Sequence, residues 1–347
     1  MTTRALDVLA CGMVTAVGLD APSACAAMRS RIDGFRETRF QSGPDELIIG
    51  APIPLIHEVV GEQRMAYLVA AAIRESLDAL PTARAMATQL VLCIPEEGRP
   101  GSPIEDSLQL VRRIGDLLGN SATHSTRVIS EGRPAGHAAL RTAARLLADP
   151  DTEHVVIAGV DSYLTAGTVT HYLAENRLLT PDNANGFIPG EAAGAILCGR
   201  AGQGNFRLAG LGLSREQAFI YNGLDEDGMH LPLRGDGMTA AYREALAECG
   251  IEMAGLGYRI ADLIGEQYWF RQSALASIRL VRGAHDFQDI RSPAESLGNV
   301  GAAVVPIMVG MAMTAAAKGY SGGSPVLVEA SSDNGACGAA IFLSRVP

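Results

Sequence analysis

The sequence predicts an α/β protein whose sheets are covered by helices on both faces. Short apolar runs rich in Val and Ile alternate with longer Ala- and Leu-rich segments of helical period. Hydrophobic residues make up 48% of the 347 residues, so the chain can bury a large core. Aromatic residues make up only 5% while Gly and Ala are abundant, which favours closely packed layers. The length favours two domains or one duplicated unit.

Strands and helices are expected to alternate along most of the chain. Each strand is a short apolar run, and the expected strands are residues 6–10, 90–94, 155–159, 193–198, 259–263, 326–330 and 339–343. Each helix is a longer segment whose apolar residues recur at helical spacing. The expected helices are residues 21–30, 63–80, 104–118, 134–148, 240–249, 268–281 and 301–319.

Two segments indicate an internal duplication. Residues 133–140 lead through a small-residue helix to the strand at 155–159, and residues 299–306 lead through another to the strand at 326–330. Each unit is a Gly-containing turn, a helix and an apolar strand that ends in acidic and hydroxyl-bearing residues. The Gly-rich polar stretch 199–205 is the expected linker. We therefore expect an N-terminal half at 1–200 and a C-terminal half at 205–347.

Charge and cysteine usage argue against several classes of protein. The net charge of -10 argues against sequence-independent binding of nucleic acid, which needs a concentrated Lys and Arg surface. The six cysteines stand singly with no metal-ligand spacing, so we expect no metal site and no disulfide framework. We also expect no cofactor. Reduced, buried thiols are typical of a cytoplasmic protein.

Neither a signal peptide nor a membrane span is expected. Asp7 interrupts the charged-then-apolar pattern of a signal peptide. Residues 300–317 carry no charge and reach the length of a membrane helix, but Gly301, Pro306 and Gly310 interrupt them and no aromatic belt flanks them. We expect a buried helix there and no insertion into a membrane.

Three segments carry a familiar set of motifs in order along the chain. Residues 10–18 read A-C-G-M-V-T-A-V-G, residues 177–194 read R-L-L-T-P-D-N-A-N-G-F-I-P-G-E-A-A-G, and residues 298–303 read G-N-V-G-A-A. They resemble the T-G-x-G-M-V-T-P-x-G, R-P-F-D-x-x-x-x-G-F-x-x-G-E-G-A-G and G-H-T-x-G-A-A-x-G motifs of the β-ketoacyl synthases. The resemblance implies the thiolase-like fold, in which two similar α/β halves pack as five layers, α-β-α-β-α, usually as a homodimer.

The same resemblance implies a catalytic cysteine and two histidines, and the chain has none of the three. No cysteine lies between Cys93 and Cys198, where the family's nucleophile would begin a helix, and Arg133 stands at the matching position. Asp262 and Asn299 stand at the positions that match the two histidines. The resemblance therefore implies the ketosynthase architecture without an intact catalytic set.

The other positions around the former pocket do not supply an obvious nucleophile. These positions are Ser130, Glu131, Gly132, Ala336 and Cys337. Ser130 lacks the G-x-S-x-G context of a nucleophilic serine. Ala336 stands where the family has an aromatic gate beside the acyl pocket. Cys337 begins no helix that would lower its pKa, so we expect a buried structural thiol.

An arginine at the start of a buried helix needs an acidic partner. Its charge opposes the helix dipole, and an unpaired buried guanidinium is costly. We predict that Arg133 pairs with Asp262 or Glu131 and closes the former pocket.

Further polar residues are expected to have structural roles. Gly190 and Glu191 form a turn in which the carboxylate accepts backbone N–H groups, as the resemblance also implies. His137 is expected to pack or cap its helix. The acidic and polar pairs at 161–162 and 333–334 follow strands at matching places in the two halves and are expected to shape loops.

Three functions are compatible with these observations. The favoured one is a catalytically inactive ketosynthase homologue that serves as a dimeric scaffold, an adaptor, or a partner of an active synthase or another complex. The second is an acyltransferase or 3-oxoacyl-[acyl-carrier-protein] synthase with a rebuilt site. The third is a module that binds an acyl chain or acyl-carrier protein without reacting. Residues 32–56 and 236–257 are shorter than the corresponding family regions, which favours the first.

Overall fold

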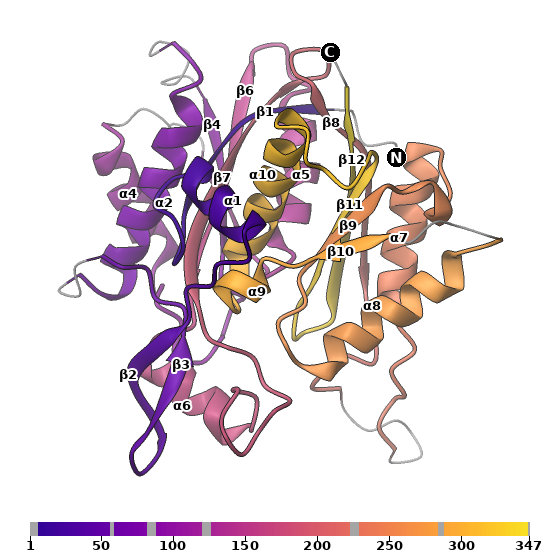
Figure 1. Ribbon diagram of the computed structural model, residues 1–347. Helices are drawn as coiled ribbons and strands as arrows, with labels where there is room; N and C mark the ends of the chain where they lie inside the picture. The colour runs from indigo at the N-terminus through magenta and orange to yellow at the C-terminus, as the bar shows by residue number, and fades with distance from the viewer. Residues whose placement is uncertain are drawn as a thin grey trace.

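The computed structural model describes residues 6–55, 59–81, 88–119, 126–222, 229–283 and 288–345, and its ten-stranded sheet consists of two halves (Figure 1). The strands of the first half are β1 (Leu6–Val14), β4 (Gln89–Ile94), β5 (Thr126–Ser130), β6 (His154–Ser162) and β7 (Glu191–Arg200). Those of the second half are β8 (Phe206–Arg215), β9 (Tyr258–Ala261), β10 (Asp289–Arg291), β11 (Val326–Ser331) and β12 (Ala336–Ser344). A separate hairpin comprises β2 (Arg36–Gly43) and β3 (Glu46–Gly50).

The two halves repeat one topology. The strand order is β5-β4-β6-β7-β1 in the first half and β10-β9-β11-β12-β8 in the second. In each half the three strands at the outer edge are parallel and the other two pairings are antiparallel. The halves join where residues Asp7 and Val8 of β1 pair with Arg207 and Phe206 of β8. This repetition confirms the duplicated α/β architecture.

Helices fill the space between the two halves and cover their outer faces (Figure 1). The central helices are α5 (Ala135–Leu146) and α10 (Val304–Ala317), and each contacts strands of both halves. On the outside, α2 (Gly61–Leu77) packs on the first half with α4 (Ser107–Leu117), and α7 (Asp236–Cys249) packs on the second with α8 (Gln267–Leu280). The result is the expected five-layer arrangement.

The remaining helices are short. They are α1 (Ala21–Arg29), which packs on β1 and α10, α6 (Ala166–Ala174) near β2, α9 (Ala294–Leu297), and the 3-10 turns Met253–Gly255 and Gly301–Ala303.

The uncharged segment at 300–317 lies in the core, as expected. A 3-10 turn at Gly301–Ala303 precedes α10, and most of the α10 side chains are buried between the two halves. Among the described residues, no helix is long and apolar enough to cross a membrane. The first five residues, on which the signal-peptide expectation partly rests, lie outside the described ranges.

The stretch 199–205 is the turn that connects the halves. The Asp7 carboxylate accepts the backbone N–H groups of Gly202 and Gly204 at 2.6 and 3.0 Å. Arg207 pairs with the same carboxylate at 2.8 Å. Asp7, whose charge counted against a signal peptide, therefore fastens this turn to the first strand.

All seven expected strands and all seven expected helices are present, but the set was incomplete. It lacked β2, β3, β5, β8, β10, α6 and the short helix α9. Some boundaries were also wrong, because β9 ends at Ala261 rather than 263 and α7 begins at Asp236 rather than 240. As a consequence, Asp262 lies in the loop after β9, where its backbone N–H still donates to the Glu329 carbonyl at 3.0 Å.

Candidate functional site

The candidate site lies where the two central helices begin. Gly132 adopts a left-handed φ of 62°, and the chain then turns through Arg133 and Pro134 into α5. Arg133 is only 2% exposed. The side chains of Arg133, Asp262 and Asp333 meet here, from the turn before α5, the loop after β9 and the loop between β11 and β12, three segments far apart in the sequence.

The Arg133 guanidinium is surrounded by two carboxylates and an aromatic ring. Its Nη1 donates to Asp262 Oδ2 at 3.2 Å, and its Nη2 donates to Asp333 Oδ1 at 3.4 Å. The guanidinium also lies 3.8 Å above the centre of the Trp269 ring. Burial alone would lower the pKa of Arg133, but the two carboxylates outweigh burial and raise it. The predicted pairing with Asp262 is confirmed, and the alternative partner, Glu131, is exposed.

Asp333 extends this contact into a larger buried network. It accepts from Arg177 Nη1 at 2.6 Å and from the Tyr172 hydroxyl at 3.3 Å. Arg177 also forms a bidentate pair with Glu266, at 2.7 and 2.8 Å. Glu266 in turn accepts from the Trp269 indole nitrogen at 2.9 Å. Two buried arginines, the buried carboxylates of Asp262 and Glu266, and the half-buried carboxylate of Asp333 therefore form one network.

Burial is the dominant influence on Asp262. It raises the pKa of this carboxyl to about 6, although Arg133 acts to lower it. A raised pKa means that the folded state holds a proton that the unfolded state releases between about pH 4 and pH 6. The stability contributed by protonated Asp262 is complete below the unfolded pKa of 3.8 and is lost as the pH rises through about 6.

We expect the Asp262→Asn variant to lack this pH dependence. Relative to the variant, the free energy of unfolding of the wild type should fall by about 3 kcal/mol between pH 4 and pH 7, from a shift of about two pKa units. Urea denaturation at several pH values measures this difference. The exposed Asp236→Asn change is the control, and a wild-type curve parallel to that of Asp262→Asn would contradict the expectation.

Asn299 holds the turn before α10. Its Oδ1 accepts the N–H of Gly301 at 3.1 Å, and its backbone pairs with Ile188 and Gly190. The side chain is 2% exposed and is occupied by its own turn. Asn299 is therefore close in the chain to the α10 start, as the resemblance placed it, but it makes none of the contacts of the Arg133 network.

Glu191 fixes the neighbouring turn. Its Oε1 accepts the Ile53 N–H at 2.9 Å, which confirms the expected bond to a backbone donor. Arg64 pairs with the same carboxylate at 2.6 Å. The adjacent Gly190 carbonyl accepts the N–H of Tyr163 at 2.9 Å. These contacts tie β7 to the ends of other elements, and they explain Gly190 and Glu191 without a chemical role.

A second buried ion pair lies beside the α10 turn. Arg99 forms a bidentate pair with Asp161, at 2.6 and 2.9 Å, and stacks on Tyr163 at 4.2 Å. Asp161 also accepts the Ala302 N–H at 3.0 Å, so it shapes the loop as expected. Burial raises the pKa of nearby Glu96, and its Oε2 has no hydrogen-bond partner among the described residues.

The remaining candidates have no geometry for nucleophilic chemistry. Ser130 is exposed at the end of β5, outside the network. Cys337 is 2% exposed, and burial raises the pKa of its thiol to about 12, so it stays protonated. Ala336 is half-buried at the start of β12. Burial lowers the pKa of His137 to about 4, and this neutral ring contacts the Val328 carbonyl at 3.1 Å.

Several residues of the network were not expected from the sequence. They are Trp269 and Asp333 as partners of Arg133, Arg177 and Glu266 farther along the network, and Arg99 in the second ion pair. Among these residues, only Arg177 had a feature in the sequence that could have indicated a place in the site, because it begins the motif at 177–194. Within the described ranges, no group of three or more His, Cys, Asp or Glu side chains could hold a metal ion.

Comparison with known proteins finds similar structures but no similar sequences. No family model matches the sequence, and no curated protein matches it. The ketosynthase from module 6 of the bacillaene synthase of Bacillus subtilis 168 has a TM-score of 0.77 at 13% identity, over 99% of this chain and 72% of that one.

Two similar structures are complexes. A ketosynthase with its chain length factor from Xenorhabdus doucetiae has a TM-score of 0.75 at 13% identity, over 99% of this chain and 98% of that one. A type II polyketide synthase ketosynthase in complex with its acyl-carrier protein has a TM-score of 0.77 at 14% identity, over 99% of this chain and 100% of that one. With the topology above, these matches show that the chain has the thiolase-like fold of these ketosynthases.

Proposed function

We propose that this protein is a ketosynthase homologue that does not condense acyl chains and acts as a structural partner in a protein complex. The observation that carries the proposal is the buried Arg133 at the start of α5, paired with Asp262 and Asp333. A guanidinium remains protonated in proteins and has no lone pair to attack a thioester.

The surrounding groups do not replace the missing chemistry. A condensing site needs an activated nucleophile and donors aimed at a developing oxyanion. Asp262 is engaged with Arg133, and Asn299 is engaged with its own turn. Because Arg133 and Asp262 already pair with each other, an acyl group would have to break this buried ion pair in order to enter.

The proposal predicts that the protein is not acylated by an acyl thioester. Incubation with an acyl-carrier protein loaded with an acyl chain, followed by mass spectrometry of the intact protein, measures any transfer. An active ketosynthase run in parallel provides the positive control. Stoichiometric labelling that disappears in Ser130→Ala or Cys337→Ser would overturn the proposal in favour of a rebuilt acyltransferase.

The protein could also bind acyl-carrier protein without being acylated by it. Calorimetric titration with acyl-carrier protein distinguishes a binding module from a scaffold that has lost this partner. The similar structures support a protein partner, since two of them are complexes with a chain length factor or an acyl-carrier protein. Heat of binding without acylation would identify a carrier-protein-binding module, and the scaffold role would then be wrong.

We further propose that the protein forms a homodimer through β5. This strand pairs with β4 on one side, and within the described residues its other edge has no partner strand. An uncovered edge presents free N–H and C=O groups that favour pairing with another strand. Sedimentation equilibrium tests the proposal, because a monomer mass at micromolar concentration would contradict it.

The cysteines support a reducing, cytoplasmic environment for this role. All six are free thiols, and four of them, Cys25, Cys93, Cys198 and Cys337, are buried. Proteins of oxidising compartments commonly use disulfides. Localisation of a tagged protein by fractionation checks this proposal, and recovery from an extracytoplasmic fraction would contradict it.

A further inference from the structure

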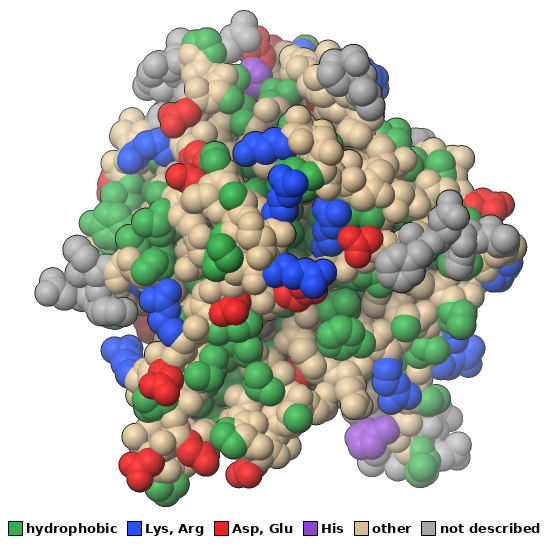
Figure 2. All heavy atoms as spheres, in the orientation of Figure 1, with side chains coloured by type: hydrophobic (Ala, Val, Ile, Leu, Met, Phe, Trp, Pro, Cys, Tyr) green, Lys and Arg blue, Asp and Glu red, His purple; other side chains and the backbone are tan. Residues whose placement is uncertain are grey.

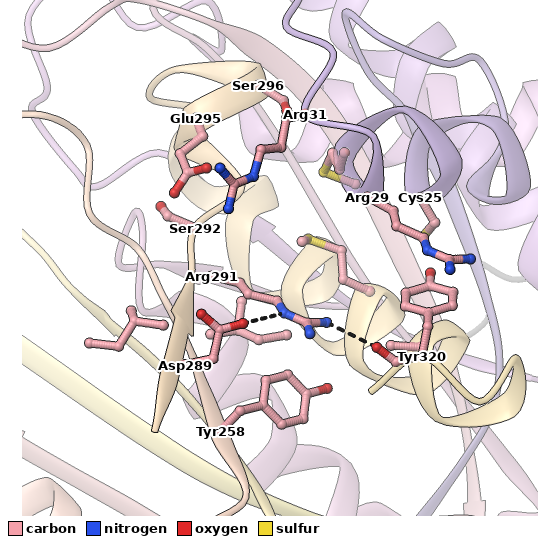
Figure 3. A pocket seen from close by; sticks show the side chains of 15 residues that line it. Cys25, Arg29, Arg31, Tyr258, Asp289, Arg291, Ser292, Glu295, Ser296 and Tyr320 are labelled. Carbon is pink, nitrogen blue, oxygen red and sulfur yellow. Dashed lines mark hydrogen bonds and ion pairs between the residues drawn. The ribbon is translucent and has the colours of Figure 1, made fainter. Parts of the chain in front are cut away.

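A pocket lies away from the Arg133 network. It has a volume of about 350 Å³ and is bounded by α1, β10, α9 and the C-terminal part of α10 (Figure 3). Tyr258, in its lining, begins β9, whereas Asp262 follows the end of that strand. Met311 and Ala315 line it from the part of α10 farthest from Asn299. The pocket is therefore a site of its own.

Three arginines contribute to this pocket. They are Arg29, Arg31 and Arg291, and the carboxylates in the lining are Asp289 and Glu295. Arg291 pairs with Asp289 at 3.1 Å, but among the described residues Arg29 and Arg31 form no ion pair. The lining thus carries three guanidinium groups against two carboxylates. Figure 2 shows Lys and Arg side chains gathered on this face, over α1, α10 and β10, in a protein whose net charge is -10.

Aromatic rings hold two of these arginines in place. The Arg29 guanidinium lies 4.2 Å from the centre of the Tyr320 ring, and that of Arg291 lies 5.0 Å from the Tyr258 ring. Arg291 Nη1 also donates to the Tyr320 carbonyl at 3.5 Å. In Figure 3, Arg291 extends between Tyr258 and Tyr320. Ring stacking positions the Arg29 guanidinium without neutralising it, so its N–H groups stay available to an anion, whereas Arg291 is already paired with Asp289 through Nε.

A buried hydroxyl in the pocket lacks a partner. Tyr258 is 1% exposed, and its hydroxyl has no hydrogen-bond partner among the described residues. In Figure 3 the hydroxyl points away from β9, into the space beside Tyr320. Burial raises the pKa of this phenol to about 12, so it remains a donor at neutral pH. Buried polar groups are almost always satisfied, and an unsatisfied hydroxyl in a pocket that is also lined by Arg29 and Arg31 indicates a missing acceptor.

We propose that this pocket binds the phosphate group of a small phosphomonoester. A phosphate presents three strong acceptor oxygens, and the lining offers as donors the guanidinium groups of the exposed Arg29 and Arg31, that of Arg291 and the buried Tyr258 hydroxyl. A carboxylate has two oxygens and would leave part of this donor set unused. The volume of about 350 Å³ exceeds that of a phosphate alone and leaves room for a small organic group against Met28 and Met311.

Calorimetric titration with phenyl phosphate, in a buffer free of phosphate and at fixed ionic strength, tests the proposal. The wild type should bind phenyl phosphate and bind benzoate at least tenfold more weakly. Arg31→Gln and Tyr258→Phe should each raise the Kd for phenyl phosphate by about tenfold, as expected for a hydrogen bond to a charged group. Arg279→Gln, on α8 and outside the pocket lining, should bind as the wild type does.

The Tyr258→Phe variant separates a binding role from a structural one. It keeps the ring beside Arg291 and removes a hydroxyl that has no partner in the described chain. Its thermal stability without ligand should therefore equal or exceed that of the wild type, while its affinity for phenyl phosphate falls. Unchanged affinity in both pocket variants, or equal binding of benzoate and phenyl phosphate, would overturn the proposal.

Discussion

The Asp333→Ala variant should lower the free energy of unfolding by about 3–5 kcal/mol, the range for breaking a buried ion pair on one side. Asp333 is the carboxylate shared by two buried arginines, at 2.6 Å from Arg177 and 3.4 Å from Arg133. Burial would raise the pKa of Asp333, but these arginines outweigh burial and lower it. Removal of the carboxylate would leave Arg177 with Glu266 and Arg133 with Asp262, a carboxyl whose own pKa is about 6.

Urea denaturation at pH 7 measures this loss. Asp236→Ala is the matched control, because Asp236 pairs with Arg279 at the surface and its side chain is 58% exposed. A surface pair of this kind contributes about 0–1 kcal/mol. If Asp333→Ala cost no more than the control, the network would not stabilise the fold, and the account of Arg133 as a filled and closed site would be wrong.

The stability of the network also explains why Arg133 and Asp262 occur together. Arg133 alone, at the start of a buried helix, would be an uncompensated charge. Asp262 alone would be a buried carboxylate with no cation beside it. Each residue is tolerable because the other is present, and Asp333 and Arg177 supply the remaining partners.

The contact between Arg133 and Asp262 could be predicted because the resemblance matches both residues to positions of one catalytic set. A buried arginine needs an acid, and the resemblance placed a candidate acid opposite it. Asp333 and Glu266 could not be predicted in the same way. They reach the site from loops 200 and 133 residues away from Arg133 along the sequence, and no local pattern distinguishes their charges from those of surface carboxylates.

The fold was predictable where hydrophobic patterns were continuous. Strands such as β6, buried along its whole length, read as unbroken apolar runs. By contrast, β8 contains Gly210 and Gly212, residues that weaken strand propensity. The structure gives the reason for one of them, since a Cβ at Gly212 would lie 1.9 Å from the Ala241 carbonyl oxygen of α7. The hairpin strands β2 and β3 were missed because β2 is largely polar and exposed.

We expect the Gly159→Ala variant to be among the most destabilised single changes in this protein. Gly159 lies in the fully buried strand β6, where the turn before α10 crosses it. An added Cβ would lie 2.2 Å from the Ala302 carbonyl oxygen and 3.0 Å from the Ala303 Cα, and both of these are backbone atoms. Because neither atom belongs to a side chain that could rotate away, the central layer itself would have to move.

Such overpacking typically costs about 1–3 kcal/mol and more where the backbone must shift, so we expect a loss at or above 3 kcal/mol. Thermal and urea denaturation of the purified variant measure it. Gly255→Ala is the control, because the nearest atom to its added Cβ is Ile251 Cβ at 3.9 Å. A Gly159→Ala protein as stable as this control would mean that the layers can separate without cost. The high Gly and Ala content would then not reflect close packing of the layers.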